Sequence, residues 1–174
     1  MWLAARVSGV AGGQPNAESF DDFYRREMPR LIVFVRRLGA TWEEAGDAAQ
    51  DAMVEALSRW QEIASPRAWV RVTAERKFLD FQKRSRQGIE LAYRSDWAIS
   101  GCYTSPEIPG EAEMVLKAIG QLPFAQRQVM AWTVDGYRAT EIAKILGYSA
   151  ATVRSNLRHG RRQLARWLAD GGAT

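Results

Sequence analysis

The sequence contains few of the residues that build disulfides, zinc sites and catalytic triads. Its 174 residues include one cysteine, Cys102, and one histidine, His159. A single cysteine excludes an internal disulfide and a zinc site made of several thiolates. A single histidine makes a histidine-based metal site or a Ser-His triad hard to build. We therefore expect no catalytic residue, no metal site and no cofactor.

Long hydrophobic runs are absent as well. No apolar stretch approaches the roughly 20 residues that a membrane-spanning helix requires. Residues 1–17 are rich in Gly and Ala and contain Pro15, without the apolar core of a signal peptide. The sequence thus predicts no membrane insertion, and it predicts a mobile arm at residues 1–17.

The net charge of +4 conceals an uneven distribution along the chain. Residues 63–86 carry +5 and residues 150–174 carry +4, whereas residues 18–62 carry −4 and residues 87–112 carry −3. Two separated basic blocks favour two contacts with one long polyanion. Two solvated helix faces are the alternative, and charge alone leaves it open.

Apolar residues recur at three- and four-residue steps along most of the chain, and no strand pattern occurs. The predicted fold class is therefore all-α. Helices are expected at residues 18–38, 41–60, 66–84, 113–122, 124–135, 140–146 and 150–168. Side chains of Ser19, Thr41 and Ser65 are expected to cap the first three. Pro29 should bend or split the first helix.

The helices are expected to form two small domains. Residues 87–112 are rich in Gly, Pro, Ser and Thr and have no sustained period, which predicts a flexible linker. The linker separates a helical domain at residues 18–86 from a second one at residues 113–170. Its length allows the two domains to lie about two duplex turns apart on DNA.

Residues 140–168 carry the most specific pattern. Apolar positions such as Ile142 form the face of a short helix, Gly147 permits a left-handed turn, and Ser149 caps the next helix. This order predicts a helix-turn-helix, whose second helix enters the major groove. An ordinary basic helix hairpin is the alternative. Candidate DNA contacts are Ser149, Ala151, Thr152, Arg154, Ser155, Arg158, Arg161 and Arg162.

The expected helix at residues 66–84 interleaves aromatic and basic side chains. Unpaired bases stack on aromatic rings for about 1–3 kcal/mol each, while Lys and Arg follow the phosphates. The helix is therefore a candidate for holding single-stranded DNA, although Trp69 taken alone is more often a core residue. The candidate contacts are Trp69, Arg71, Arg76, Lys77, Phe78, Asp80, Lys83 and Arg84.

Two stretches of the chain carry motifs that belong together. Residues 20–84 contain Phe20-Asp21-Asp22-Phe23-Tyr24, Ala45-Gly46-Asp47-Ala48-Ala49-Gln50-Asp51 and Pro66-Arg67-Ala68-Trp69-Val70. Residues 115–168 contain Leu122-Pro123, Gln126-Arg127-Gln128-Val129, Glu141-Ile142-Ala143, Leu146-Gly147 and Ser149-Ala150-Ala151-Thr152-Val153-Arg154-Ser155. In these motifs the chain resembles regions 2 and 4 of the extracytoplasmic-function sigma factors of bacterial RNA polymerase, in the sigma-70 family.

The resemblance implies a cytoplasmic factor that binds core RNA polymerase and promoter DNA and directs promoter-specific transcription initiation. It implies that the helix after Ser149 reads the −35 element and that the helix at residues 66–84 reads and melts the −10 element. It also implies an anti-sigma protein as a further partner. The residues implied in core polymerase binding are Asp47, Gln50, Asp51 and Glu55.

The chain departs from the family pattern in both regions. Arg76 stands where the family usually has Asn, and Glu75 stands where a basic residue is common. Ala151 stands where Gly is frequent, and His159-Gly160 replaces the usual Arg-Ala. Glu75 and Arg76 bear directly on which −10 sequence the protein prefers.

Three other functions fit the sequence less well than that of a sigma factor. A sigma-like decoy that binds an anti-sigma protein tends to lose its basic DNA-binding residues, which this chain keeps. A plain helix-turn-helix regulator leaves the acidic helix face and the aromatic, basic helix without a role. An enzyme built on Asp47 and Asp51 lacks a third metal ligand and a nearby histidine.

Overall fold

The computed structural model describes residues 18–92 and 110–170, and for residues 85–92 and 111–112 it describes the backbone only. These described residues form seven α-helices and one 3-10 helix, without a strand, which confirms the predicted all-α fold class. The elements are α2 (Phe20–Arg37), α3 (Trp42–Ser58), η1 (Trp60–Glu62), α4 (Pro66–Ala92), α5 (Gly110–Gly120), α6 (Phe124–Val134), α7 (Ala139–Leu146) and α8 (Ala150–Ala169).

Two of the three side-chain caps expected at the first helix starts are present, and α4 begins at Pro66 as the sequence predicts. The Ser19 side chain accepts a hydrogen bond from the backbone of Asp22, and Thr41 forms a capping box with Glu44. The cap expected from Ser65 is wrong, because its buried hydroxyl has no hydrogen-bond partner. Helix α2 runs through Pro29 as one element, so Pro29 does not split it.

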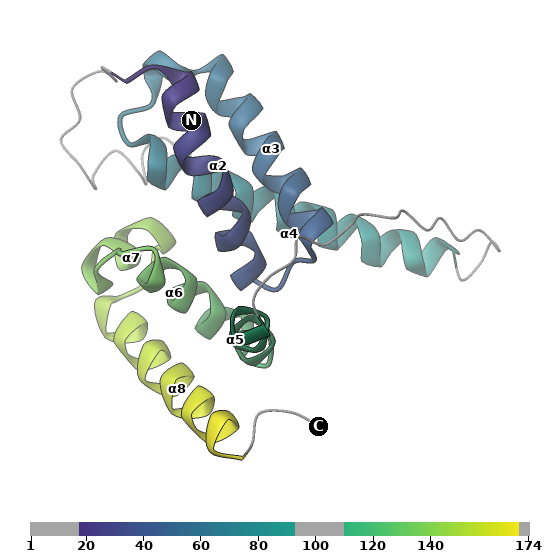
Figure 1. Ribbon diagram of the computed structural model, residues 1–174, viewed down its shortest axis with the longest axis vertical. Helices are drawn as coiled ribbons and strands as arrows, with labels where there is room; N and C mark the ends of the chain where they lie inside the picture. Colours follow the sequence, from purple (N-terminus) through teal and green to yellow (C-terminus); the bar gives the residue numbers. More distant parts are fainter. Residues whose placement is uncertain (1–17, 93–109, 171–174) are drawn as a thin grey trace.

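Helices α2, α3 and α4 form the first domain, seen in the upper half of Figure 1. The inner face of α3 is made largely of alanines, including Ala45, Ala49 and Ala52, all of them fully buried. Small side chains let neighbouring helices approach closely, so α3 packs against both α2 and α4. Leu57, next to the buried Ala56, is exposed.

The linker expected at residues 87–112 is shorter than predicted. Residues 87–92 continue α4 beyond its expected end near Arg84, and residues 110–112 already belong to α5. The rest of that linker lies outside the described residues, as do Cys102 and the arm expected at residues 1–17.

Helices α5 to α8 form the second domain. Helix α7 ends at Gly147, whose φ of 71° lies in the left-handed region, and the Ser149 side chain accepts a hydrogen bond from the Thr152 backbone at 3.0 Å. This sharp turn directs α8 across α6 and α7, and Val153 and Leu157 face that core. The predicted helix-turn-helix is therefore present.

The two domains are docked against one another. The C-terminal half of α2 lies over α5 and α6, as Figure 1 shows, and α2 contacts both helices. The rings of Phe34 in α2 and Trp132 in α6 meet edge to face, with centroids 5.1 Å apart. Buried residues of both domains therefore belong to one continuous hydrophobic core.

Candidate nucleic-acid and polymerase interfaces

The first candidate surface is the outer side of α8. Val153, Leu157 and Gly160 face the core and hold the helix in place. The side chains expected to contact DNA lie on the other side, where all are exposed except Ser155, which is half-buried. The exposed ones are Ser149, Ala151, Thr152, Arg154, Arg158, Arg161 and Arg162. The structure thus brings this predicted set together on one basic helix face.

Gly160 lies where α8 packs against α6. A Cβ atom added there would lie 3.2 Å from the Met130 methyl carbon and 3.6 Å from Leu122 Cδ1. The missing side chain lets α8 lie close to α6, which carries Met130. The Gly160 half of this departure therefore concerns helix packing, whereas His159 beside it is exposed.

The second candidate surface is divided by the structure. Asp80, Lys83 and Arg84 are exposed near one another on α4, beside Phe81, which is 45% exposed. Trp69 and Phe78 are buried in the core, so in this structure they cannot stack on unpaired bases. Phe81 is the exposed ring on this stretch, and the sequence reasoning had not included it among the DNA contacts.

Arg76 and Lys77 are engaged with α3. Arg76 donates to both carboxylate oxygens of Glu55, at 3.0 and 2.9 Å, and Lys77 Nζ lies 3.2 Å from the same carboxylate. Burial alone would raise the pKa of Glu55, but the hydrogen bonds from these two cations lower it below its usual range. Glu55 was expected to bind the polymerase, yet here it ties α3 to α4.

The third candidate surface is the outer face of α3. Asp47, Gln50 and Asp51 are exposed there, as the sequence predicts. Val54 and Leu57, which are 63% and 56% exposed, extend the same face by one turn. This apolar patch was not predicted from the sequence. Its signal is the helical spacing, because Val54 lies four residues after Gln50 and three after Asp51, which puts it on the same face.

A buried ionic cluster lies at the contact between the two domains, which we call the domain seam. The sequence did not reveal it. Arg71 in α4 is 0% exposed and pairs with Glu27 of α2 at 3.1 Å and with Asp135, which follows α6. Arg37 of α2 pairs with the same Asp135 at 2.9 Å. Burial would raise the pKa of Glu27, but Arg71 and its neighbouring arginines lower it. Arg71 was expected to contact DNA, and the second domain covers it.

A second polar cluster lies further along the seam. Glu75 of α4 accepts hydrogen bonds from the side chains of Gln128 and Trp132 in α6, the latter at 3.4 Å. The Tyr148 hydroxyl donates to the Gln128 carbonyl oxygen at 3.2 Å. Burial raises the pKa of Glu75 to about 7, against the opposing effect of its two hydrogen bonds.

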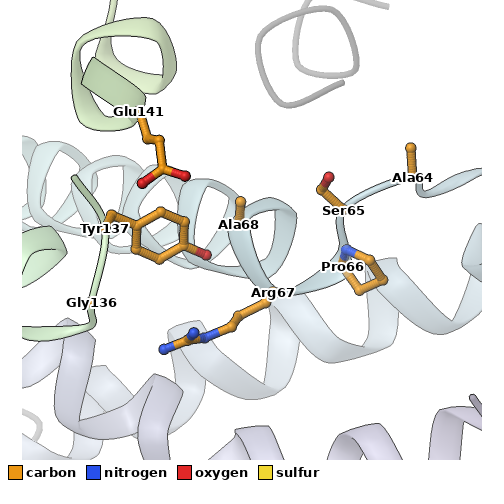
Figure 2. A pocket seen from close by; sticks show the side chains of 8 residues that line it. All are labelled: Ala64, Ser65, Pro66, Arg67, Ala68, Gly136, Tyr137 and Glu141. Carbon is orange, nitrogen blue, oxygen red and sulfur yellow. The ribbon is translucent and has the colours of Figure 1, made fainter. Parts of the chain in front are cut away.

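Two cavities lie along the contact between the two domains. One has a volume of about 380 Å³ and lies where the first turn of α4 meets Gly136 and Tyr137. Figure 2 shows Tyr137 and Glu141 on one side of it and Ser65 and Pro66 on the other, with the Arg67 side chain extending below Tyr137. The second, of about 600 Å³, is lined by arginines of α2 and α4 and by Asp135. The cluster of Arg37, Arg71 and Asp135 thus borders the second cavity, whereas Glu75 borders neither cavity.

The described residues give no sign of a metal site or a membrane span. No three His, Cys, Asp or Glu side chains among them are grouped so that they would hold a metal ion. Within residues 18–92 and 110–170, no helix combines the length and apolar character needed to cross a membrane.

Solved structures share this fold. The sigma factor RpoE in complex with the anti-sigma factor NepR, from Bartonella quintana, matches with a TM-score of 0.68 at 20% identity. The match covers 86% of this chain and 96% of that one. CnrH in complex with the cytosolic domain of CnrY matches with a TM-score of 0.63 at 22% identity over 97% of each chain.

Sequence comparisons identify the two domains. The family model for sigma-70 region 2 matches residues 23–88, and that for sigma-70 region 4 matches residues 112–164. The ECF RNA polymerase sigma factor SigM of Mycobacterium tuberculosis is 29% identical over 170 residues, which are 95% of this chain and 82% of SigM. The ECF RNA polymerase sigma factor SigE of Mycolicibacterium smegmatis is 25% identical over 171 residues, covering 94% of this chain and 66% of SigE. With both regions in order on the two helical domains, the chain belongs to the extracytoplasmic-function sigma factors of the sigma-70 family.

Proposed function

We propose that this sigma factor directs promoter-specific transcription initiation through three separate surfaces. The outer face of α8 reads the −35 element, the exposed end of α4 engages the −10 element, and the outer face of α3 binds core RNA polymerase. The observation that carries the proposal is the helix-turn-helix, whose second helix presents an exposed basic face opposite its buried side. The protein acts where the polymerase works, in the cytoplasm.

The proposed −35 contacts follow from the chemistry of α8. Small residues such as Ala151 at its start allow close approach to base edges in the major groove. Arg154 and Arg158, four residues apart, lie on one face and reach guanine edges or phosphates. Arg161 and Arg162 extend the basic face along the phosphate backbone.

The proposed −10 contacts lie on the exposed stretch of α4. Lys83 and Arg84 follow the phosphates, and Phe81 supplies a ring on which a base of the melted strand stacks. Arg71 joins this surface only when the second domain moves away from it.

Two protein partners are part of the proposal. Asp47, Gln50 and Asp51 give α3 an acidic and polar face for a basic partner, and the apolar patch of Val54 and Leu57 adds area to bury. We assign this face to core RNA polymerase, as the family resemblance implies. An anti-sigma protein is the second partner, supported by the similar fold of RpoE, which was solved with NepR.

Run-off transcription with purified core polymerase tests the proposal. The protein should direct transcription from a subset of promoters in genomic DNA of its source. Arg154→Ala and Arg158→Ala should each weaken binding to the −35 element by about 1–3 kcal/mol where the arginine contacts a guanine. Where it contacts a phosphate, the slope of log K against log [salt] should become shallower by about one unit.

Arg166→Ala is the matched control, because Arg166 is exposed in the last turn of α8, outside the proposed contacts. No binding to core polymerase at low salt would reject the sigma-factor function. A −35 footprint unchanged in both variants would reject the role of these two arginines. Core binding without initiation at any promoter would instead favour a decoy.

A further inference from the structure

The larger cavity at the domain seam, of about 600 Å³, is rich in positive charge. Four arginines of α2 and α4 line it, and Asp135 is the one acidic residue in the described part of its wall. Small-molecule sites have volumes of about 300–1,000 Å³, so the cavity has the size of such a site. We name it the arginine cavity, after Arg30, Arg37, Arg67 and Arg71.

Two carboxylates are shared among these four arginines. Glu27 pairs with every one of them except Arg37, at distances from 3.1 to 3.7 Å. Asp135 pairs with Arg37 at 2.9 Å and also with Arg71. Four positive charges therefore stand against two negative ones, which leaves an excess of two positive charges at the cavity.

The cations are exposed to solvent and the carboxylates are buried. The side chains of Arg30 and Arg67 are 59% and 48% exposed, and that of Arg37 is 20% exposed. The side chains of Glu27 and Asp135 are 2% and 8% exposed. A molecule that enters the arginine cavity therefore meets guanidinium groups before it meets a carboxylate.

This excess charge favours a phosphate compound as the ligand. Guanidinium groups that outnumber their carboxylates repel one another, and an anion between them relieves the repulsion. The planar fork of N–H donors of an arginine binds two oxygens of a phosphate at once. A phosphate carries up to two negative charges and three terminal oxygens, so a compound with several phosphates serves more than one fork.

Part of the wall of the arginine cavity is apolar. Pro29 and Val33, four residues apart on α2, line it together with Val134 at the end of α6. Val134 is 54% exposed, which is unusual for a valine next to so many charges. An organic group attached to the phosphates would bury this apolar surface, whereas an inorganic ion would leave it in water.

We propose that the arginine cavity binds a small molecule that carries several phosphate groups on an organic body, with a nucleoside triphosphate as the chemical class that fits it. The site goes beyond the proposed function and needs only the contact between the domains that the structure shows. The phosphates of a DNA strand offer the same chemistry to an arginine. The experiment therefore includes a nucleic acid as a second source of phosphate.

Isothermal titration calorimetry on the full-length protein tests the site. The probes are ATP and tripolyphosphate, which carry the same phosphates with and without an organic body, in buffer free of magnesium. Each should bind once per chain, ATP more tightly because its nucleoside covers the apolar wall. Arg30→Ala should weaken both by about tenfold through the loss of a hydrogen bond to a charged group. Its partner Glu27 lies on the same helix, so the ion pairs between the domains stay in place. Arg25→Ala is the control, an exposed arginine of α2 outside the cavity.

A charge series at Val134 distinguishes ligand binding from a purely structural role of the arginines. Val134→Glu places a carboxylate in the cavity and should weaken the binding of both probes by about tenfold, while Val134→Lys should tighten it by a similar factor. Val134→Gln, which has the size of the glutamate variant without its charge, is the matched control. Far-UV circular dichroism verifies that the helices remain in each variant.

Several results would overturn the inference. They are the absence of binding by either probe at millimolar concentration, affinities that the Arg30 and Val134 variants leave unchanged, and ATP that binds no more tightly than tripolyphosphate. Loss of probe binding in Arg161→Ala would place the anion on α8 instead. A single-stranded oligonucleotide should not follow the Val134 series; if it follows the series as strongly as ATP does, the arginines serve DNA. Run-off transcription enters none of these measurements, so a failure of the proposed function leaves their result standing.

Discussion

Raising the pH should weaken the contact between the two domains through Glu75. An exposed glutamate titrates near 4.5, whereas the pKa of Glu75 is about 7 while the domains are docked. The docked state therefore binds a proton that is released when the domains separate. The contribution of Glu75 to the stability of the domain contact is fully present below pH 4.5. It is lost progressively as the pH rises toward 7, the pKa of Glu75 in the docked state, and the loss levels off above that pH.

The charged groups near Glu75 do not change how it titrates over this pH range. The side chains of α6 that face Glu75 are the neutral Gln128 and Trp132. On its own helix, Arg71 is held by two carboxylates and Arg76 is turned to α3. In the docked state the neighbouring arginines hold the pKa of Glu27 below its usual range, so this carboxylate favours its ionised form there.

The magnitude follows from the two pKa values. Between pH 5.5 and pH 7.5 the equilibrium constant for docking should fall by about 20-fold, which corresponds to about 1.8 kcal/mol. Glu75→Gln retains a hydrogen-bond acceptor and a similar shape but binds no proton. Its docking equilibrium should be independent of pH over this range.

Fluorescence energy transfer between dyes on the two domains measures the effect. The dyes are attached to cysteines placed at the exposed positions Gln61 and Lys144, with Cys102 replaced by Ser. Transfer in the wild type should decrease from pH 5.5 to pH 7.5, and transfer in Glu75→Gln should stay constant. Equal pH dependence in both proteins, or closer docking at higher pH, would refute the reasoning.

The remaining predictions concern single side chains outside the seam. Leu57→Asp should leave the fold intact and weaken binding to core polymerase by about tenfold, because an apolar contact of about 1–2 kcal/mol is lost. The control is Leu168→Asp, since Leu168 on α8 is also an exposed leucine, at 57%. Phe81→Ala should slow open-complex formation by about tenfold through the loss of base stacking, whereas Phe78→Ala should lower the free energy of unfolding by about 3–5 kcal/mol. Gly160→Ala should raise stability by up to about 1 kcal/mol in thermal unfolding, because the methyl end of the methionine above it can move while the helix gains alanine's preference. A loss of stability in that variant would show that the packing of α6 on α8 cannot adjust.

Local features of the fold were predictable from the sequence. Caps at Ser19 and Thr41, the turn at Gly147 and the apolar spacing of α8 each depend on residues within one or two turns of one another. The basic face of α8 followed because a straight helix separates a buried stripe from an exposed one.

Long-range contacts were beyond the same reasoning. The sequence places Arg71 and Glu75 on a basic, aromatic helix, and nothing in the spacing connects them to Asp135 or Gln128 about sixty positions later. Phe78 and Phe81 show the same limit at short range. They are three residues apart on one helix with irregular apolar spacing, and tertiary packing decides which of them is buried.

The two departures from the family pattern on α4 have a common structural consequence. Glu75 is turned to the second domain and Arg76 to Glu55 of α3, so both side chains make contacts within the protein. Neither is available to DNA in the docked state. Reading of the −10 element must then depend more on the exposed stretch from Asp80 to Arg84, whose side chains make no contact with the second domain in the hydrogen bonds and ion pairs of the described residues. On this argument, substitution of Lys83 should alter promoter choice more than substitution of Arg76 does, although Arg76 occupies the position where the family usually has Asn. Selection from a randomised −10 library with each variant measures that difference, and a larger change from Arg76→Asn would contradict it.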